Sequence, residues 1–457
     1  MKIIIVGDGK LGHTLAEQMI GEGHDVTIIE KSPVVLQQNE DSLDALYIQG
    51  NGVSMTTLKD AGSAAADLII AVTVSDESNM LCCLTGKLLG AKYAVARIRD
   101  PEYYDSLSFI QNKLSIDYVI NPERTAAHEI SRLLRYPFAG SVETFARGRV
   151  EMMDFSATED DVVVGVPLRD LGRRHRTLPQ VLYCAVERDG LPIIPKGDFV
   201  IRPGDRVHVA SDAATITDFF RQLGKNTLHV HNVLIAGASR IAHYLSIMLI
   251  SMNIRVTIVE IDPKKARSIA EALPDAEVLE GDCTSQELLG SIGLTGFDAF
   301  VTLMDHDEDN LMTAFYAVSQ GVRKVITKNN RLPHGDIIKR MGLDSVISTK
   351  QVTCNTILRF VRALNNAGDT AVERVYRLMD GRVEALEFIA SEHADYLHVP
   401  LKDLWMPDDM LIATIVRDGH VRIPFGNDTI EARDNVIIIT LARGVKDLSE
   451  LIRVKKP

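Results

Sequence analysis

Short apolar runs alternate with helix-like stretches in two parts of the chain. Between the first two runs, for example, Leu11, Leu15 and Met19 fall at helical spacing. Continuous apolar runs of this length are typical of strands that are buried on both faces of a parallel sheet. The runs are Ile3–Val6, Val26–Ile29, Leu68–Val72, Ala94–Ile98 and Tyr118–Ile120 in the first part, and Val233–Ala236, Val256–Val259, Ala299–Leu303, Lys324–Thr327 and Val346–Ile347 in the second. The pattern predicts two Rossmann-type, doubly wound α/β units with parallel sheets.

The two parts are copies of one sequence. Val26–Glu30 (VTIIE) recurs as Val256–Glu260 (VTIVE), and Val166–Leu171 (VPLRDL) recurs as Val399–Leu404 (VPLKDL). The offset between matching positions changes only from 230 to 233 residues between these two pairs. Chance matches would not stay in order over such a distance, so the chain is a tandem duplication.

The sequence pattern changes after each α/β unit: the predicted strands become short, and residues typical of turns separate them. Asp189-Gly190 and Asp418-Gly419 are turn dipeptides, because Gly accepts a positive φ and Asp bonds its own backbone. A small α+β lobe is therefore expected after each unit, with a linker near Leu223–His231. The predicted domains are residues 1–139, 140–225, 230–366 and 371–457.

A glycine-rich loop follows the first predicted strand. Gly7-Asp8-Gly9-Lys10-Leu11-Gly12 is a complete G-x-G-x-x-G, and Glu30 stands at the end of the second strand. The glycines permit a tight turn, close approach of a pyrophosphate and close packing of helix on sheet. A carboxylate at the position of Glu30 suits the ribose hydroxyls of an adenosine and repels a 2′-phosphate. The loop thus favours NAD(H) over NADP(H); the alternative is a structural turn that binds nothing.

The second copy of this loop departs from the pattern. Gly237-Ala238-Ser239-Arg240-Ile241-Ala242 keeps only the first glycine, while Glu260 is retained and Arg240 lies beside the expected phosphate position. The second loop is expected either to form a weaker or different nucleotide site or to be an empty structural relic.

Further candidate ligand contacts follow strands of the first unit, at the sheet edge where open α/β sheets bind ligands. Thr73 and Val74 come after the fourth apolar run and Arg97 lies at the end of the next. Arg97 is expected either to contact phosphate or ribose, or to form an ion pair with Asp76 or Glu77.

Composition narrows the functional classes. The 457 residues carry a net charge of −12, which disfavours bulk nucleic acid as a partner because phosphate binding needs a basic face. The longest uncharged helical stretch contains about 14 residues against the roughly 20 that a membrane span needs. The five cysteines are scattered without a metal-ligand pattern. We expect a reduced, cytoplasmic environment and no metal site.

No catalytic pattern accompanies the nucleotide loops. None of the 13 histidines forms a relay with Asp, Glu or Cys, and no residue has the spacing of a dehydrogenase proton donor. The chain is therefore expected not to be an enzyme. The alternatives are an NAD-dependent oxidoreductase with a degenerate second half, and a regulatory module of another cation transporter or antiporter.

The stretch from Ile241 to Ile254 predicts a helix that is apolar around most of its circumference. Such a helix is buried on more than one side. Its expected partner is another subunit, through residues such as Met248 and Met252, or else the small lobe of its own half.

Four segments together resemble one family, the RCK modules that regulate potassium conductance. They are Gly7–Gly12 with Glu30, Ser75–Met80, Ala96–Arg99 and Pro167–Leu171. The tandem arrangement is similar to the peripheral nucleotide-binding subunits of bacterial Trk potassium-uptake systems. This resemblance implies binding of NAD(H) and of ATP or ADP, assembly into a dimeric or tetrameric ring, and a location at the inner face of the membrane through a Trk-type channel subunit.

The resemblance also implies which residues contact the nucleotide. They are Gly7, Asp8, Gly9, Lys10, Leu11, Glu30, Thr73, Val74 and Arg97 in the first half, and Ser239, Arg240, Ile241 and Glu260 in the second. The sequence departs from the family pattern at Asn51, where Asp is common, and at Ser239 and Ala242, which replace glycines.

Overall fold

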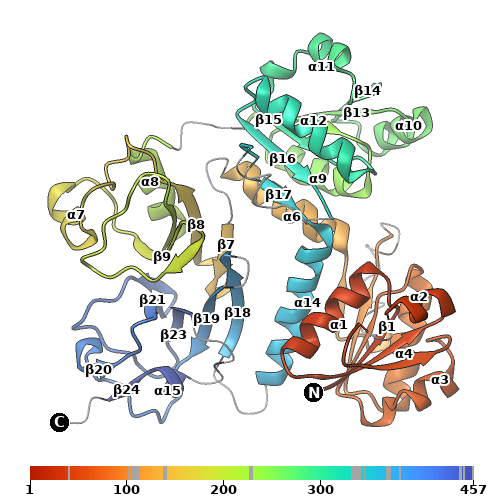
Figure 1. Cartoon of the computed structure of the whole chain (residues 1–457), viewed down its shortest axis with the longest axis horizontal. Coiled ribbons are helices and arrows are strands. Elements are labelled where there is room, and N and C mark those ends of the chain that lie inside the picture. Colours follow the sequence, from red (N-terminus) through yellow and green to blue (C-terminus); the bar gives the residue numbers. More distant parts are fainter. Residues whose placement is uncertain are drawn as a thin grey trace.

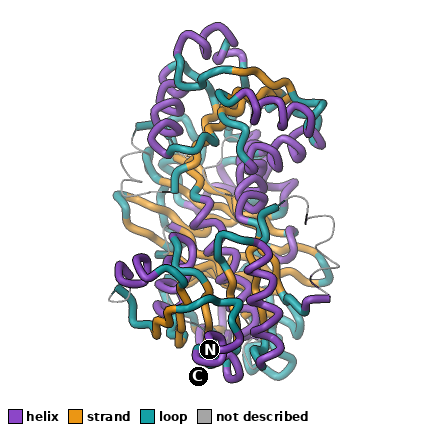
Figure 2. Tube along the Cα trace, turned by 90° about the vertical axis from the view of Figure 1, so that its right-hand side faces the viewer, coloured by secondary structure: helices purple, strands orange, loops and turns teal. Residues whose placement is uncertain are grey.

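Two large α/β units and two small lobes alternate along the chain in the computed structural model (Figure 1). Both termini lie at the lower end of the molecule in Figures 1 and 2. The structure describes residues 1–39, 42–100, 103, 111, 113–136, 142–225, 230–330, 341–343, 345–366, 372–379, 382–441, 445 and 448–454. Residues 226–229 of the expected linker lie outside these ranges.

Each large unit contains a six-stranded parallel sheet with the same topology. The first sheet has the order β3-β2-β1-β4-β5-β6 and the second the order β14-β13-β12-β15-β16-β17. The strands of the first are β1 (Lys2–Val6), β2 (Asp25–Glu30), β3 (Leu46–Gln49), β4 (Leu68–Ala71), β5 (Tyr93–Arg97) and β6 (Tyr118–Ile120). Those of the second are β12 (Asn232–Ala236), β13 (Arg255–Glu260), β14 (Glu277–Glu280), β15 (Ala299–Thr302), β16 (Lys324–Lys328) and β17 (Ser345–Ile347). The predicted doubly wound fold and its duplication are confirmed.

Every predicted apolar run coincides with a strand, but β3 and β14 are not among the runs. Both lie at the edge of their sheet, and each has two exposed and two half-buried positions and none that is fully buried. An edge strand faces solvent along one side and needs no continuous apolar sequence, which explains why the hydrophobic pattern missed it.

Each parallel sheet has a buried core on both faces, and helices cover both of them. The helices of the first half are α1 (Lys10–Gly21), α2 (Pro33–Asn39), α3 (Met55–Asp60), α4 (Asp76–Leu89) and α6 (Pro122–Arg135). In the second they are α9 (Arg240–Ser251), α10 (Pro263–Ala272), α11 (Gln286–Ile292), α12 (Asp307–Ser319) and α14 (Thr349–Asn366).

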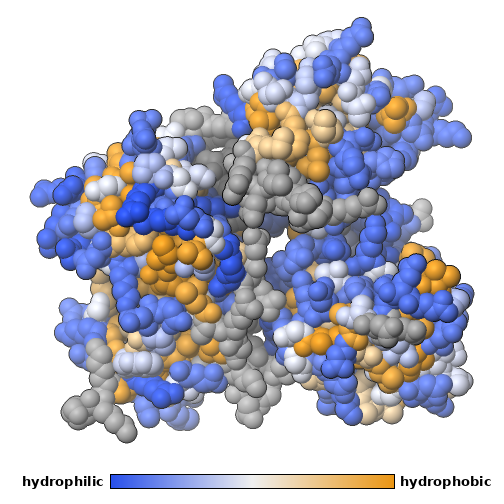
Figure 3. All heavy atoms as spheres, viewed as in Figure 1, coloured by the Kyte–Doolittle hydropathy of each residue, from blue (hydrophilic) through white to orange (hydrophobic). Residues whose placement is uncertain are grey.

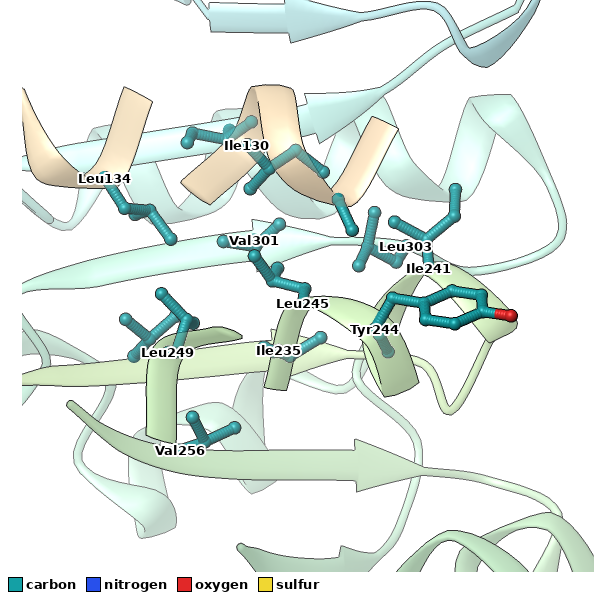
Figure 4. Close-up of a cluster of buried hydrophobic side chains, with 14 of the residues drawn as sticks. Ile130, Leu134, Ile235, Ile241, Tyr244, Leu245, Leu249, Val256, Val301 and Leu303 are labelled. Carbon is teal, nitrogen blue, oxygen red and sulfur yellow. The ribbon is translucent and has the colours of Figure 1, made fainter. Parts of the chain in front are cut away.

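The last helix of each unit packs on the other unit. Helix α6 follows β6, yet its Ile130 and Leu134 lie in the core of the second unit with Ile235 and Leu245 (Figure 4). Helix α14 follows β17, and its Ile357, with Cys354, Leu358 and Val361, lies in the core of the first unit. The two halves therefore exchange helices, and neither large unit completes its core from its own half alone.

This exchange explains the apolar helix at Ile241–Ile254. The corresponding α9 packs on its own sheet with one face and on α6 with another. The structure thus differs from both expected partners of the helix, another subunit and the small lobe of its own half. Its partner is α6, which comes from the first half of the same chain. Ile247 and Met252 remain 48% and 43% exposed.

The small lobes are antiparallel five-stranded sheets with orders β10-β9-β11-β8-β7 and β18-β19-β23-β21-β22. The first consists of β7 (Val142–Phe145), β8 (Val150–Ser156), β9 (Leu182–Arg188), β10 (Leu191–Ile193) and β11 (Arg206–Ser211), with α7 (Leu168–Arg174) and α8 (Ala213–Gln222). The second consists of β18 (Val372–Leu378), β19 (Val383–Ile389), β21 (Met410–Arg417), β22 (His420–Arg422) and β23 (Asn435–Thr440), with the β20 (Leu404–Trp405)–β24 (Arg453–Val454) pair and α15 (Leu448–Leu451). The predicted turns at Asp189-Gly190 and Asp418-Gly419 are present, with positive φ at all four residues.

The two small lobes pack against each other through one face of each sheet. Their shared core includes Val150 and Met152 of β8, Ala385 of β19 and Ile437 of β23. Figure 3 shows apolar side chains around the line where the lobes meet, while hydrophilic residues cover much of the large units. Within the described residues, no helix is long and apolar enough to cross a membrane.

Candidate nucleotide-binding sites

The first glycine loop has the geometry of a phosphate-binding turn. Gly7 has a φ of +100°, and a Cβ there would lie 3.2 Å from the backbone nitrogen of Thr73. A Cβ on Gly12 would lie 1.9 Å from the carbonyl oxygen of Gly7, so helix and strand approach each other only because Gly12 has no side chain. Gly9 precedes α1, offers no side-chain cap and faces open space. The first amides of α1 are therefore available to an anion.

The acidic residue at the end of the second strand is held in the same way in both halves. Glu30 accepts a hydrogen bond from the Asp8 amide at 2.8 Å and from the Ser32 amide at 2.7 Å, one on each carboxylate oxygen. Glu260 accepts from the Ala238 and Asp262 amides at 2.6 and 2.8 Å. Each oxygen retains a lone pair, which suits a further bond from a ribose hydroxyl.

The second residue of the loop, Asp8 in the first half, has a side chain that stabilises the first loop and has no equivalent in the second. The Asp8 carboxylate is buried, accepts a hydrogen bond from Asn39 Nδ2 at 2.8 Å and lies 3.3 Å from His13 Nδ1. Burial raises the pKa of Asp8 from its usual value, against the lowering effect of Asn39 and His13. The corresponding residue of the second loop is Ala238, whose methyl group makes no such bonds.

The second loop accommodates the loss of two glycines. Ala242 is fully buried, and the hydroxyl oxygen of Ser239 caps α9 by accepting from the Ala242 amide at 3.4 Å. A cavity of about 480 Å³ opens beside this loop. Glu260, Gly281 and Asp282 line it, at the carboxyl ends of β13 and β14.

A larger cavity of about 850 Å³ lies between the two halves. Both loops reach it, Gly9–Leu11 from the first half and Ala238–Ile241 from the second. Of the predicted contacts, Val74 and Arg97 also line it. Seven basic side chains surround this shared cavity, namely Lys10, Arg97, Arg99, Arg240, Lys265, Lys328 and Lys350; its acidic residues are Glu123, Asp305, Asp307 and Glu308. Such an excess of positive charge attracts phosphate groups.

Arg97 and Lys328 occupy equivalent positions at the ends of β5 and β16 and face the shared cavity. Arg97 donates to the Thr73 carbonyl, and Lys328 donates to the Met304 carbonyl. Burial lowers the pKa of both side chains. No carboxylate lies within ion-pair distance of Arg97 among the described residues, and its buried Nε has no hydrogen-bond partner there. Among the described residues, Arg97 therefore forms neither of the two expected ion pairs, and its contact with a phosphate or a ribose stays a prediction.

The loop after the fourth strand is fixed by an asparagine in each half. Asn79 accepts from the Thr73 amide at 2.8 Å and donates to the Arg97 carbonyl at 2.9 Å. In the second half, Asn310 accepts from the Met304 amide at 2.8 Å. In the first half, Val74 follows the Thr73 held by Asn79; its side chain is 92% exposed and lines the shared cavity.

Sequence reasoning missed several basic residues of the shared cavity, including Arg99, Lys265, Lys328 and Lys350. The duplication carried a signal for one of them, since an offset of 231 residues places Lys328 opposite Arg97. Among the described residues, no cluster of His, Cys, Asp and Glu could hold a metal ion, and all five cysteines are buried and unpaired.

Comparison with known families matches both halves of the chain. The TrkA-N domain model matches residues 3–122 and 233–349, and the TrkA-C domain model matches residues 152–224 and 386–453. The chain belongs to the TrkA family. Its resemblance to tandem RCK proteins, first indicated by the duplicated motifs, is thereby confirmed.

TrkA proteins of distant organisms resemble the chain over nearly its whole length. The "Trk system potassium uptake protein TrkA" of Haemophilus influenzae is 32% identical, over 96% of this chain and 93% of that protein. The TrkA homolog of Archaeoglobus fulgidus is 30% identical, over 99% of this chain and 100% of that protein.

Solved structures confirm the fold of this chain. The RCK domain of GsuK covers 96% of it with a TM-score of 0.62 at 16% identity, and the alignment spans 92% of that structure. The GsuK channel bound to NAD covers 96% with a TM-score of 0.63, spanning 76% of the channel chain, again at 16% identity.

Proposed function

We propose that this chain is a non-catalytic regulatory subunit of a potassium-uptake transporter, which binds NAD(H) and ADP or ATP and gates a membrane channel subunit. The relatives that cover nearly the whole chain are named as Trk potassium-uptake proteins. GsuK, which has the same fold, has been solved with NAD and with ADP. The observation that carries the proposal is the shared cavity, where two nucleotide loops face each other across a basic surface.

The chemistry of a bound nucleotide follows from these surroundings. Glu30 or Glu260 accepts hydrogen bonds from the ribose hydroxyls, and the phosphates lie in the shared cavity. Amides at the start of α1 donate to phosphate oxygens, while Arg97 and Lys328 neutralise their charge. A polyphosphate is thus contacted from both halves at once.

Gating then requires that nucleotide binds two conformations unequally. Phosphates that attract basic groups from both halves stabilise a state in which the large units approach each other. Helices α6 and α14 pack on both units, and each is the helix that precedes a small lobe in the sequence, so they are suited to pass a relative movement of the units to the lobes. A full switch from 1:99 to 99:1 needs roughly a 10⁴-fold difference in affinity. Coupled sites in a dimeric or tetrameric ring would divide that requirement among them.

Two measurements test the proposal. Calorimetric titration of the full chain with NADH, NAD, ADP and ATP should give saturable binding. Rubidium uptake into vesicles that contain the membrane subunit of the same transport system should then depend on both the chain and the nucleotide. Flux that is indifferent to either component would refute gating. Oxidation of bound NADH by a panel of keto acids would instead favour the oxidoreductase alternative.

A further inference from the structure

Arg99 lies two residues beyond the end of β5 and faces the shared cavity with its guanidinium group partly exposed. Its Nε donates to Glu123 Oε1 at 2.7 Å. Its backbone amide donates to Asp76 Oδ2 at 2.8 Å. Helices α4 and α6 therefore hold both the side chain and the amide of this residue from within the first half.

The carbonyl group of Arg99 is held from both halves. It accepts a hydrogen bond from Asn121 Nδ2 at 3.3 Å and a longer one from the Tyr244 hydroxyl at 3.5 Å. Asn121 Nδ2 also donates to the Tyr244 hydroxyl oxygen at 3.1 Å. Asn121 itself is fixed, because its Oδ1 caps α6 through the Arg124 amide at 2.9 Å. Tyr244 thus connects α9 of the second half to the Arg99 backbone.

The tyrosine is well anchored for this contact. Its ring is 6% exposed and packs in the apolar cluster with Ile241 and Leu303. Figure 4 shows the hydroxyl group at the edge of that cluster, pointing away from the aliphatic side chains. Arg240, which lines the cavity, lies one helical turn before Tyr244 on the same face of α9. The buried ring fixes the position of the hydroxyl group, which donates to the Arg99 carbonyl and accepts from Asn121.

Among the described residues, no equivalent of this arrangement is present in the second half. Asn330, at an offset of 231 from Arg99, repeats the bond of its amide to a carboxylate, donating to Asp307 at 3.0 Å. At an offset of 230 from Tyr244, the first half has Thr14, whose hydroxyl donates to the Lys10 carbonyl in its own helix at 3.0 Å. The contact between halves is therefore built on one side of the shared cavity, the side that carries the arginine.

We propose that Tyr244, together with Asn121, is a positioning residue that aims Arg99 at the terminal phosphates of a nucleoside polyphosphate bound at the second-half loop. This inference rests on the proposed nucleotide binding. The cavity beside that loop receives the nucleoside, and the shared cavity carries the phosphate chain toward the first half. Arg99 then senses a second or third phosphate but not the first, which stays at the start of α9.

Calorimetric titration of the full chain with AMP, ADP and ATP tests the assignment. Tyr244→Phe keeps the ring and removes the hydroxyl group. We expect its affinity for ATP to fall about 2- to 10-fold, as for the loss of one hydrogen bond, with AMP affinity unchanged. Arg99→Gln should give the same dependence on phosphate number. The double variant should bind ATP no more weakly than Arg99→Gln alone, because both changes act through the same group.

Matched variants separate positioning from general structure. Asn121→Ser retains a helix-capping oxygen but loses the amide donor, so it should reproduce the Tyr244→Phe profile. Tyr316→Phe removes a hydroxyl from α12 of the same half, away from the cavity, and should change nothing. Unchanged ATP affinity in Tyr244→Phe, equal losses for AMP and ATP, or additive losses in the double variant would overturn the inference. A wild-type chain that binds none of the three nucleotides would instead refute the proposed nucleotide binding.

Discussion

The exchange of helices predicts that a cavity made in the first half of the sequence weakens the second α/β unit. Ile130 of α6 is fully buried in the core of that unit. Ile130→Ala removes about three carbon atoms, and transfer at about 0.8 kcal/mol per carbon gives about 2.4 kcal/mol. The residual cavity adds to this, within the usual range of about 2–5 kcal/mol. A loss of about 3 kcal/mol corresponds to roughly 100-fold more frequent opening of the affected unit.

Hydrogen exchange followed by mass spectrometry resolves which unit opens. In Ile130→Ala, peptides from β12 and β13 should exchange roughly 100-fold faster, while those from β1 and β2 change little. Ile357→Ala in α14 should produce the reverse, because Ile357 is buried in the first unit.

A third variant controls for a general loss of stability. Ile216 is equally buried, but in the core of the first small lobe, so Ile216→Ala should leave both large units unchanged. Faster exchange in β1 and β2 of Ile130→Ala, with β12 protected as before, would show that α6 serves its own unit and that the exchange of helices is wrong.

Three further predictions concern the first loop and the interface of the small lobes. Glu30→Arg should weaken NADH binding and favour NADPH relative to it; calorimetry showing equal loss of both would contradict the ribose assignment. Gly9→Asp should abolish dinucleotide binding at the first loop by placing a carboxylate near the pyrophosphate, without unfolding, because a Cβ at Gly9 meets no atom within 4 Å. Burial lowers the pKa of His208 from its usual value of about 6.5, so the unfolded chain binds a proton that the folded chain does not. The free energy of unfolding should therefore decrease as the pH falls below about 6.5. In thermal unfolding, the midpoint temperature of His208→Gln should decrease less over the same pH range than that of the unmodified chain.

The parallel sheets could be predicted because their central strands are buried on both faces and read as continuous apolar runs. The edge strands β3 and β14 could not, since half of their side chains face solvent. The exchange of α6 and α14 could not be predicted from the hydrophobic pattern either. An amphipathic helix shows the same sequence whichever sheet it covers, and only the surplus apolar face of α9 indicated an additional partner.

The glycine loops and their acidic partners could be recognised because a local strand–loop–helix turn determines their geometry. The shared cavity could not, because it joins loops that lie 230 residues apart and depends on how the two units face each other. The duplication nevertheless constrains that arrangement. A basic residue that lines the cavity in one half, such as Arg97, has its counterpart, Lys328, at the repeat offset.

The two loops differ in how they present themselves to phosphate. In the first, Gly12 permits a close approach of helix and strand, and the start of α1 carries no side-chain cap. In the second, the equivalent residue is the fully buried Ala242, and Ser239 takes up one amide of α9, so fewer backbone donors remain. Arg240, in the place of Lys10, adds a forked donor suited to phosphate. The second loop thus offers fewer backbone donors and one additional forked side-chain donor at the same place beside the shared cavity.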